Sequence, residues 1–413
     1  MDDLTQLERD VSVMLRDRAG ADTRPPVTAS RVASRARRRR IVNAVSASAA
    51  VLLLVAGGTS VLRSVGSDEV LPPPAVPVTQ HHNGALVIVG SNPGPLAVKP
   101  DGTASTFRIA RPRLMQGGWA PTWSPDGTRL ALLAGRLSLN SDNDTVALYV
   151  ADADGSNVRK LTDCPEIYSC AVATGSGLSW SPDSRSIAIT SGHLYVVDVA
   201  DGARRQLPGG ELVLAPAWSP DGSVIAVGAR LGQDEAWEVR TVRADAEGDD
   251  TARVATLVDD LPSVDSLDWS PDATRLVISA GDGLHVVDAN GNAPFNIVSQ
   301  DRGEGPAAAT WSPDGTRIAY FTTPRVSDGF TAELRVVDPD SGHDEALFVA
   351  PCCVSEWHPP AWSPDGTRIA LSVEITGHPD RTGLFLVSTD GTADALRVPL
   401  DGMPGFPAWQ PLP

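Results

Sequence analysis

The sequence predicts an all-β chain that folds as a seven-bladed β-propeller and is preceded by one transmembrane helix. Three observations support this prediction. The tetrapeptide Trp-Ser-Pro-Asp recurs six times, at spacings that suit a four-stranded blade. A seventh tryptophan near the C-terminal end completes a repeat that begins, without a tryptophan, near residue 85. An uncharged stretch of 22 residues, 41–62, follows a cluster of arginines.

Residues 1–40 form a basic segment with ten arginines and six acidic residues, which we expect to be cytoplasmic. Leu4, Leu7, Val11 and Leu15 recur at helical spacing, so residues 3–18 are expected to form an amphipathic helix. This helix would bind a cytoplasmic partner or lie on the membrane. The alternative is a frayed helix that leads into the arginines.

Residues 41–62 are long enough to cross the roughly 30 Å hydrocarbon core as a helix. Four arginines, 37–40, precede this segment directly and only Arg63 follows it, which places the N-terminus in the cytoplasm. A cleaved signal peptide and a buried core helix are the alternatives. Forty residues are long for the n-region of a signal peptide, so a signal anchor in the cytoplasmic membrane is favoured. Everything after residue 63 is then extracytoplasmic.

Residues 63–82 are rich in proline and predict a stiff linker, and residues 83–413 hold the repeats. The repeat motif begins at a tryptophan in each copy, at spacings of 57, 38, 51, 42, 51 and 47 residues: Trp123, Trp180, Trp218, Trp269, Trp311, Trp362 and, in a shortened copy, Trp409. We expect each of these tryptophans to fill the gap between neighbouring blades.

The residues after the tryptophan predict a hairpin turn. Serine opens a type I turn, proline presets φ, and glycine takes the left-handed conformation that closes the turn. Two copies have Ser184 or Ala273 in place of this glycine, so some strain is expected in their hairpins.

The two ends of the repeat region complement each other. Residues 94–104 align without a gap with residues 383–393, yet no tryptophan motif precedes the first of these segments. Residues 405–410 are therefore expected to supply the innermost strand of a blade whose other three strands come from residues 85–109. This pairing gives seven blades and leaves no open sheet edge at the closure. A six-bladed ring is the alternative.

These motifs resemble the WD40-like, TolB-type (PD40) propeller repeat, whose usual signature is P-x-W-S-P-D-G-x-x-I-A. The resemblance covers about residues 83–411. It implies one of three roles for this chain: a platform in a periplasmic assembly, the gating domain of a prolyl-peptidase-like enzyme, or a ligand-binding ectodomain. The chain lacks the additional N-terminal α/β domain of TolB, and no G-x-S-x-G nucleophile elbow follows the repeats. An anchor followed by a propeller is similar to membrane proteins of actinobacteria.

Residues 64–413 carry 23 basic and 45 acidic residues, a net charge of −22. So acidic a body repels phosphate backbones, and we expect no binding of nucleic acid.

The four cysteines are the first candidates for local chemistry, because an extracytoplasmic compartment favours disulfides. Cys164 and Cys170 bracket a five-residue loop and are expected to pair, while Cys352 and Cys353 are adjacent and predict a vicinal disulfide. The sequence leaves the connectivity open. The segment that follows them, with Trp357 and His358, is a candidate ligand-binding loop, and an ordered loop that packs its own aromatic ring is the alternative.

No catalytic, cofactor or metal site is predicted, because a motif repeated in six blades does not provide one asymmetric constellation. We therefore expect a scaffold rather than an enzyme, one that binds a cell-envelope protein or a small ligand. A linked version of this hypothesis is a transmembrane sensor, in which residues 1–40 report inward. The alternative is a propeller enzyme, such as a lyase, lactonase or glycan hydrolase. That alternative requires a polar cluster with perturbed pKa values in the central channel.

Overall fold

The fold was obtained as a computed structural model. It describes residues 81–89, 96–99, 103–107, 109, 118–136, 145–164, 177–210, 212–230, 232, 235–248, 250–292, 295–299, 304–323, 325–326, 329–330, 332–350, 354–357, 359–375, 382–391, 394–398 and 405–412. The predicted cytoplasmic segment, transmembrane helix and most of the linker lie outside these residues. Within them, no helix has the length and apolar character needed to cross a membrane.

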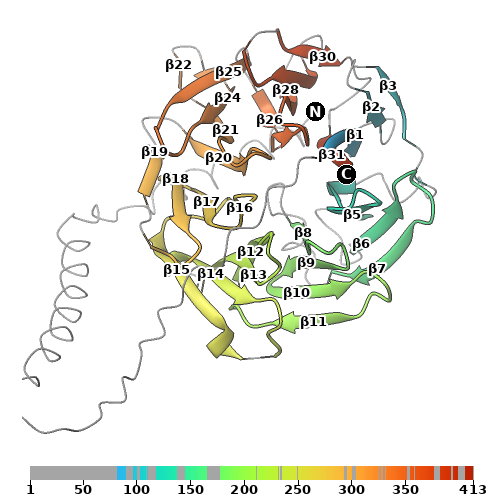
Figure 1. Ribbon diagram of the computed structural model, residues 1–413, viewed down its shortest axis with the longest axis vertical. Helices are drawn as coiled ribbons and strands as arrows, with labels where there is room; N and C mark the ends of the chain where they lie inside the picture. The colour runs from blue at the N-terminus through green and yellow to red at the C-terminus, as the bar shows by residue number, and fades with distance from the viewer. Residues whose placement is uncertain are drawn as a thin grey trace, which may run out of the picture. The chain divides into compact units, whose positions relative to one another are not determined.

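Seven antiparallel sheets are arranged as blades around a common centre (Figure 1). Each blade is written here from its innermost to its outermost strand. Blade 1 consists of β31 (Phe406–Leu412), β1 (His82–Val89), β2 (Leu96–Val98) and β3 (Ala104–Thr106). Blade 2 consists of β4 (Gly118–Trp123), β5 (Arg129–Arg136), β6 (Thr145–Asp152) and β7 (Arg159–Asp163). Blade 3 consists of β8 (Leu178–Trp180), β9 (Ser186–Ser191), β10 (His193–Asp198) and β11 (Arg204–Leu207).

The remaining blades follow in chain order. Blade 4 consists of β12 (Leu212–Trp218), β13 (Val224–Arg230), β14 (Trp237–Arg243) and β15 (Val254–Leu261), with the short 3₁₀ turn η2 (Thr251–Arg253) before β15. Blade 5 consists of β16 (Ser266–Trp269), β17 (Arg275–Ala280), β18 (Gly283–Asp288) and β19 (Phe295–Ser299). Blade 6 consists of β20 (Glu304–Trp311), β21 (Ile318–Thr323), β24 (Ala332–Val337) and β25 (Asp344–Ala350), with a small hairpin of β22 (Arg325–Val326) and β23 (Gly329–Phe330) between its middle strands.

Blade 7 has a broken inner strand. Both β26 (Val354–Trp357) and β27 (Ala361–Trp362) pair with β28 (Arg368–Ile375), which is followed by β29 (Gly383–Ser388) and β30 (Leu396–Val398). Two prolines, Pro359 and Pro360, lie in the interruption. Proline has no backbone N–H to donate to a strand ladder, which accounts for the break.

The predicted seven-bladed ring and its closure are confirmed, and the six-bladed alternative is excluded. Strand β31 pairs antiparallel with β1, with Leu86 opposite Trp409 and His82 opposite Leu412. Gln410 adds a second link. Its Oε1 accepts a hydrogen bond from Ala85 N at 3.1 Å, and its Nε2 donates to Gly127 O in blade 2 at 2.7 Å. One side chain thus joins the closing strand to β1 of its own blade and to the neighbouring blade 2.

The hydrophobic core is divided among the seven seams between adjacent blades. Each buried apolar cluster takes its residues from two neighbouring blades; the last, for example, joins Leu384 and Leu386 of blade 7 to Leu86, Ile88 and Trp409 of blade 1. Six of the motif tryptophans belong to these clusters, and the seventh, Trp218, packs against one of them. Since burial of apolar area drives folding, blades support each other rather than standing alone.

Five motif tryptophans also form a hydrogen bond across their seam. Each indole Nε1 donates to the carbonyl of the residue that precedes the tryptophan of the previous blade, at 3.1–3.2 Å: Trp123 to Ala408, Trp180 to Thr122, Trp269 to Ala217, Trp362 to Thr310 and Trp409 to Ala361. The two exceptions are Trp218, which donates to Gly222 O in its own turn, and Trp311, whose Nε1 has no partner among the described residues.

The serine and aspartate of each motif stabilise the hairpin turn. In blade 6, Ser312 Oγ donates to Asp314 Oδ1 at 2.6 Å and accepts from Arg317 N at 2.9 Å, and the other five copies repeat the serine–aspartate bond. The predicted left-handed position is also observed. At this position Gly315 has φ of 72°. Ser184 and Ala273, which stand in place of the glycine in two copies, have φ of 59° and 60°.

Replacing Ser312 with alanine is expected to destabilise the propeller by about 1–2 kcal/mol, because it leaves the part-buried backbone N–H of Arg317 without its acceptor. Ser312 is only 1% exposed. Chemical denaturation of the purified protein measures the difference. Ser105→Ala is the matched control, since Ser105 is exposed and its one bond, to Ala97 O, is 3.5 Å long. Equal stability losses in the two variants would contradict a role of the motif serine in the turn.

Candidate functional site: the inner strand of blade 5

The two faces of the ring differ in the connections that they carry. In an antiparallel blade, the turn from the first to the second strand and the turn from the third to the fourth lie at one edge, and the other connections lie at the opposite edge. The Ser-Pro-Asp turns therefore share one face with the short Asp-Gly turns, which we call the turn face. The opposite loop face carries connections of unequal length, from the single residue Gly192 to the segment that contains β22 and β23. Binding residues are commonly carried by such loops on a rigid scaffold.

The residue before each motif tryptophan lies on the face of the inner strand opposite to the tryptophan. In five blades this residue is partly exposed while both of its chain neighbours are buried; these residues are Thr122, Ser179, Asp268, Thr310 and Ala361. The tryptophan packs in the seam with the previous blade, so the residue before it is directed to the seam with the next blade, where Ala217 and Ala408 join apolar clusters. Asp268 is the one ionisable residue at this position among the seven copies of the motif.

Asp268 also takes part in one of the two seams that lack the indole bond. Its Oδ2 accepts hydrogen bonds from Trp311 N at 2.7 Å and from Thr310 Oγ1 at 2.9 Å, both in blade 6. Ser179 plays the same part at the other seam, where its Oγ accepts from Trp218 N at 2.9 Å. A polar side chain before the tryptophan thus accepts a hydrogen bond from the backbone N–H of the tryptophan in the next blade. In these two seams it replaces the indole-to-carbonyl link.

Burial raises the pKa of Asp268 to about 6, although hydrogen bonds from Trp311 N, the Thr310 hydroxyl and Trp269 N oppose this shift. A carboxyl with this pKa exists in both protonation states near neutral pH, as a general acid or base requires. A second carboxyl precedes the same strand. Burial raises the pKa of Asp265 too, against a 3.2 Å hydrogen bond from Ser263 Oγ. Among the residues that the structure describes, the two carboxyls whose pKa values are raised therefore both belong to the inner strand of blade 5 or to the residues that lead into it.

Sequence reasoning missed Asp268, although the signal was present. Alignment of the seven motifs on their tryptophans would have shown one charged residue in a column otherwise filled by Thr, Ser and Ala. The six motif aspartates have the opposite character. In Asp314, for example, burial raises the pKa, but hydrogen bonds from Ser312 and Thr316 outweigh it and hold the pKa below its usual value. Their carboxylates are committed to turns.

The predicted candidate residues lie elsewhere. Trp357 ends β26, and His358 lies outside the described residues, so the candidate binding loop stays a prediction. Cys164 is buried and disulfide-bonded. Cys170, Cys352 and Cys353 lie outside the described residues, so the predicted pairing is not settled. Within the described part of the chain, no three His, Cys, Asp or Glu side chains are grouped to hold a metal ion.

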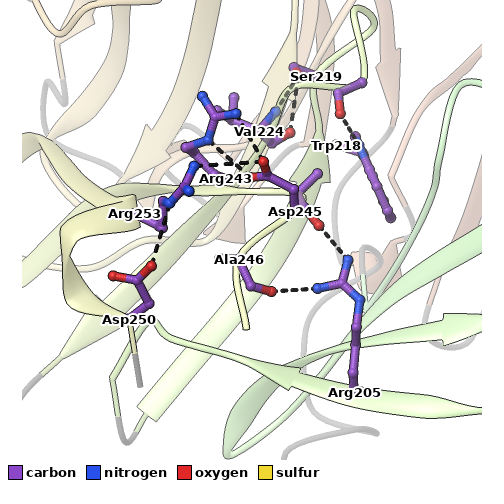
Figure 2. A network of polar contacts seen from close by, with 11 residues as sticks. Arg205, Trp218, Ser219, Val224, Arg243, Asp245, Ala246, Asp250 and Arg253 are labelled. Atoms are coloured by element: carbon purple, nitrogen blue, oxygen red, sulfur yellow. Dashed lines mark hydrogen bonds and ion pairs between the residues drawn. The ribbon is translucent and has the colours of Figure 1, made fainter. Parts of the chain in front are cut away.

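Other polar clusters support the seams and blades. Figure 2 shows Arg205 of β11 donating to the Ala246 carbonyl in the next blade, beside Arg243 and Arg253, which pair with Asp245. The side chains of these last three residues are about half exposed, from 43% to 59%, so such pairs contribute little to stability. We assign this cluster to architecture.

Blade 6 holds a more buried cluster. Arg335 lies between Glu333, at 2.8 Å, and Asp344, at 3.2 Å. Burial raises the pKa of Tyr320, and the neighbouring Asp344 carboxylate raises it further. Arg335 is therefore paired with two carboxylates of the same blade, and the cluster needs no further partner for its positive charge.

Comparison with known proteins shows the fold and a match to a relative over a short stretch of the chain. No known family model matches the sequence. A 70-residue stretch is 39% identical to the uncharacterized peptidase YuxL of Bacillus subtilis, and the match covers 17% of this chain and 9% of that protein. Among solved structures, the chain is similar to TolB from Acinetobacter baumannii, with 19% identity and a TM-score of 0.47 over 80% of this chain and 81% of that one.

Two enzymes have the same fold. An oligogalacturonate lyase in complex with manganese is 13% identical, with a TM-score of 0.53 over 79% of this chain and 86% of its own. A Bacteroides uniformis protein assigned as a 6-phosphogluconolactonase is 14% identical, with a TM-score of 0.52 over 79% of this chain and 98% of its own. At these identities, the likeness shows the propeller fold alone.

These findings correct the prediction that the chain is not an enzyme. The relative matched over 70 residues is named as a peptidase, and solved structures of this fold include an oligogalacturonate lyase and a protein assigned as a lactonase. The prediction relied on the repetition of the motif in every blade. That argument was wrong, because an asymmetric residue beside the motif, such as Asp268, distinguishes one blade from the other six.

Proposed function

We propose that this chain is a membrane-tethered, extracytoplasmic propeller that binds a cell-envelope protein or a small ligand through its loop face and central channel. The observation that carries the proposal is the asymmetry of blade 5. The turn face repeats the same hydrogen bonds from blade to blade, whereas Asp268 and Asp265, alone among the carboxyls of the described residues, have a raised pKa, and both belong to the inner strand of blade 5 or lead into it.

Tethering is part of the proposal and is supported by the sequence. The uncharged residues 41–62 and the arginines before them fit a signal anchor with the N-terminus in the cytoplasm. Residues 1–40 would then report ligand binding inward, or recruit a cytoplasmic partner.

A second candidate is a propeller enzyme of the cell envelope, such as a lyase, lactonase or glycan hydrolase. The observation that favours it is the pKa of Asp268, about 6, in a side chain on the inner strand of blade 5 that bonds to Thr310 and Trp311 of blade 6. In this reading Asp268 moves the proton and Thr310 positions its carboxyl.

Crosslinking in intact membranes tests the first candidate. Partners captured by the full-length protein are compared with those captured by a variant that lacks residues 1–40, and protease added outside the cytoplasmic membrane reports the side on which the propeller lies. We expect extracytoplasmic partners common to both proteins. If neither protein captures a partner, or the propeller is protected from outside protease, the proposal fails. Partners that disappear with residues 1–40 identify the cytoplasmic interaction.

The enzyme candidate needs its own measurement. Purified protein is assayed against uronic oligosaccharides, sugar lactones and neutral glycans, and any turnover is repeated with Asp268→Asn. A proton-transfer role predicts loss of turnover and of its pH dependence near pH 6 in the variant. Turnover unchanged by Asp268→Asn would remove this carboxyl from the mechanism.

A further inference from the structure

Two side chains of blade 4 stand together at the loop face. Arg230 ends β13 and Trp237 begins β14, and the connection between these two strands belongs to the loop face. Arg230 lies on the same side of the sheet as Gly228, where an added Cβ would lie 2.7 Å from the side chain of Val264 at the start of blade 5. Trp237 packs against the apolar cluster of this same seam. The pair therefore occupies the loop-face end of the seam between blades 4 and 5.

The guanidinium of Arg230 stacks on an aromatic ring and makes no polar contact. Its Cζ lies 5.2 Å from the centroid of the Trp237 ring. Its Nε is buried and has no hydrogen-bond partner, while the side chain as a whole stays partly exposed. Among the described residues, the stacking on Trp237 is the one contact of this guanidinium that the structure shows. Stacking holds the plane of the guanidinium in place and leaves its N–H groups open to a ligand.

Arg230 differs in this respect from the other arginine side chains that the structure describes. Most of them donate to a carbonyl or pair with an acid. Two more, Arg129 and Arg185, lie within electrostatic reach of the aspartates of their own motif turns. Residues 64–413 carry a net charge of −22, so a shortage of acids does not account for the missing partner of Arg230.

The acids at this end of the seam are engaged elsewhere. Glu238 lies on the other side of β14, where it pairs with Arg240 at 2.9 Å. Asp282, on the loop face of blade 5, bonds to His285 at 2.8 Å. A charged group that is partly removed from water is costly to leave without a counter-ion, so the unpaired guanidinium calls for an anion from outside the described part of the chain.

We infer that the loop face binds a carboxylate at Arg230, with the Trp237 ring holding the guanidinium in place. A guanidinium presents two parallel N–H groups that match the two oxygens of a carboxylate. One guanidinium suits the single charge of a carboxylate better than the nearly double charge of a phosphate monoester. This inference rests on the proposed function, because it names the chemistry of the ligand that the loop face takes.

The test compares charged and neutral forms of one small probe. Binding of benzoate to the full-length protein in detergent is measured by calorimetry at pH 7.5 and constant ionic strength, with neutral benzamide and doubly charged phenyl phosphate as comparisons. We expect benzoate to bind about tenfold tighter than benzamide, which is the effect of one charge-assisted pair. Equal binding of benzoate and benzamide would overturn the inference. Tighter binding of phenyl phosphate than of benzoate would overturn the choice of a carboxylate.

Three variants complete the experiment. Arg230→Gln should weaken benzoate binding about tenfold and still unfold cooperatively, because its guanidinium has no polar partner to lose. Arg230→Lys keeps the charge without the paired N–H groups and should bind with intermediate affinity. Arg185→Gln removes the same charge from an exposed turn of blade 3 and should behave as the wild type.

Benzoate binding that survives Arg230→Gln, or that falls equally in Arg185→Gln, would contradict a site at Arg230. Partners captured by crosslinking together with equal binding of benzoate and benzamide would overturn this inference and leave the proposed function standing.

Discussion

Replacing Gly127 with alanine is expected to lower the melting temperature of the propeller by about 5–10 °C, which corresponds to roughly 3 kcal/mol. Gly127 closes the motif turn of blade 2 at φ of 68°, and an added Cβ would lie 1.9 Å from the Pro411 carbonyl oxygen of the closing strand. The variant therefore combines the strain of a left-handed alanine with an overlap that forces β31 away. Thermal unfolding followed by circular dichroism measures the change.

The matched control is Gly366→Ala. Gly366 closes the same turn in blade 7 at φ of 72°, so the backbone strain is equal, but its nearest neighbour would be Pro313 Cδ at 4.0 Å. We expect a loss of about 1 kcal/mol there. The closure described here would be contradicted by similar melting temperatures in the two variants.

Replacing Asp268 with asparagine is expected to stabilise the protein at pH 7.5, by up to about 3 kcal/mol. In the folded chain its pKa is raised from 3.8 to about 6, so folding favours the protonated carboxyl. Its contribution to stability is complete below pH 4 and is lost as pH rises through 6. The shift of about two units corresponds to roughly 3 kcal/mol of cost in the charged form. An asparagine accepts the Trp311 N–H and bonds to Thr310 without that cost.

The difference between variant and wild type should therefore shrink as pH falls from 7.5 to 4.5, which denaturation at each pH measures. Asp272→Asn is expected to change the stability at pH 7.5 in the opposite direction. Burial raises the pKa of Asp272, but hydrogen bonds from Ser270 and Thr274 outweigh it, so the carboxylate stabilises the fold at neutral pH. We expect Asp272→Asn to lose about 1 kcal/mol at pH 7.5. A pH-independent effect of Asp268→Asn would show that its carboxyl is not desolvated in the folded protein.

Much of the fold could be predicted because the two ends of the repeat region each carry part of the same blade. The gapless alignment of residues 94–104 with 383–393 located three strands without a tryptophan, and Trp409 supplied the missing fourth. The pairing of Leu86 with Trp409 follows from that complementarity. The turns were also predictable, because serine, proline and a left-handed residue at fixed offsets define one hairpin geometry.

The candidate site could not be predicted in the same way. Comparison of the repeats identifies the residues that the blades share. Asp268 differs instead from the Thr, Ser or Ala that precedes the tryptophan in the other six copies. Its raised pKa depends on desolvation between two blades and on a seam in which Trp311 has no indole bond, and both are properties of packing. The break in the inner strand of blade 7 at Pro359 and Pro360 likewise lay in a segment that we interpreted as a ligand-binding loop.

The pairing of β1 with β31 sets an order of events in the cell. The partners of residues 82–89 lie more than 300 positions downstream, at 406–412, so β1 has no inner neighbour until nearly the whole repeat region has been synthesised. Contacts of such long range form slowly, and an exposed strand edge invites pairing with other chains in the meantime. A nascent product that stops before Phe406 would keep its first blade open, and would be a substrate for chaperones and proteases rather than a slightly shorter ring.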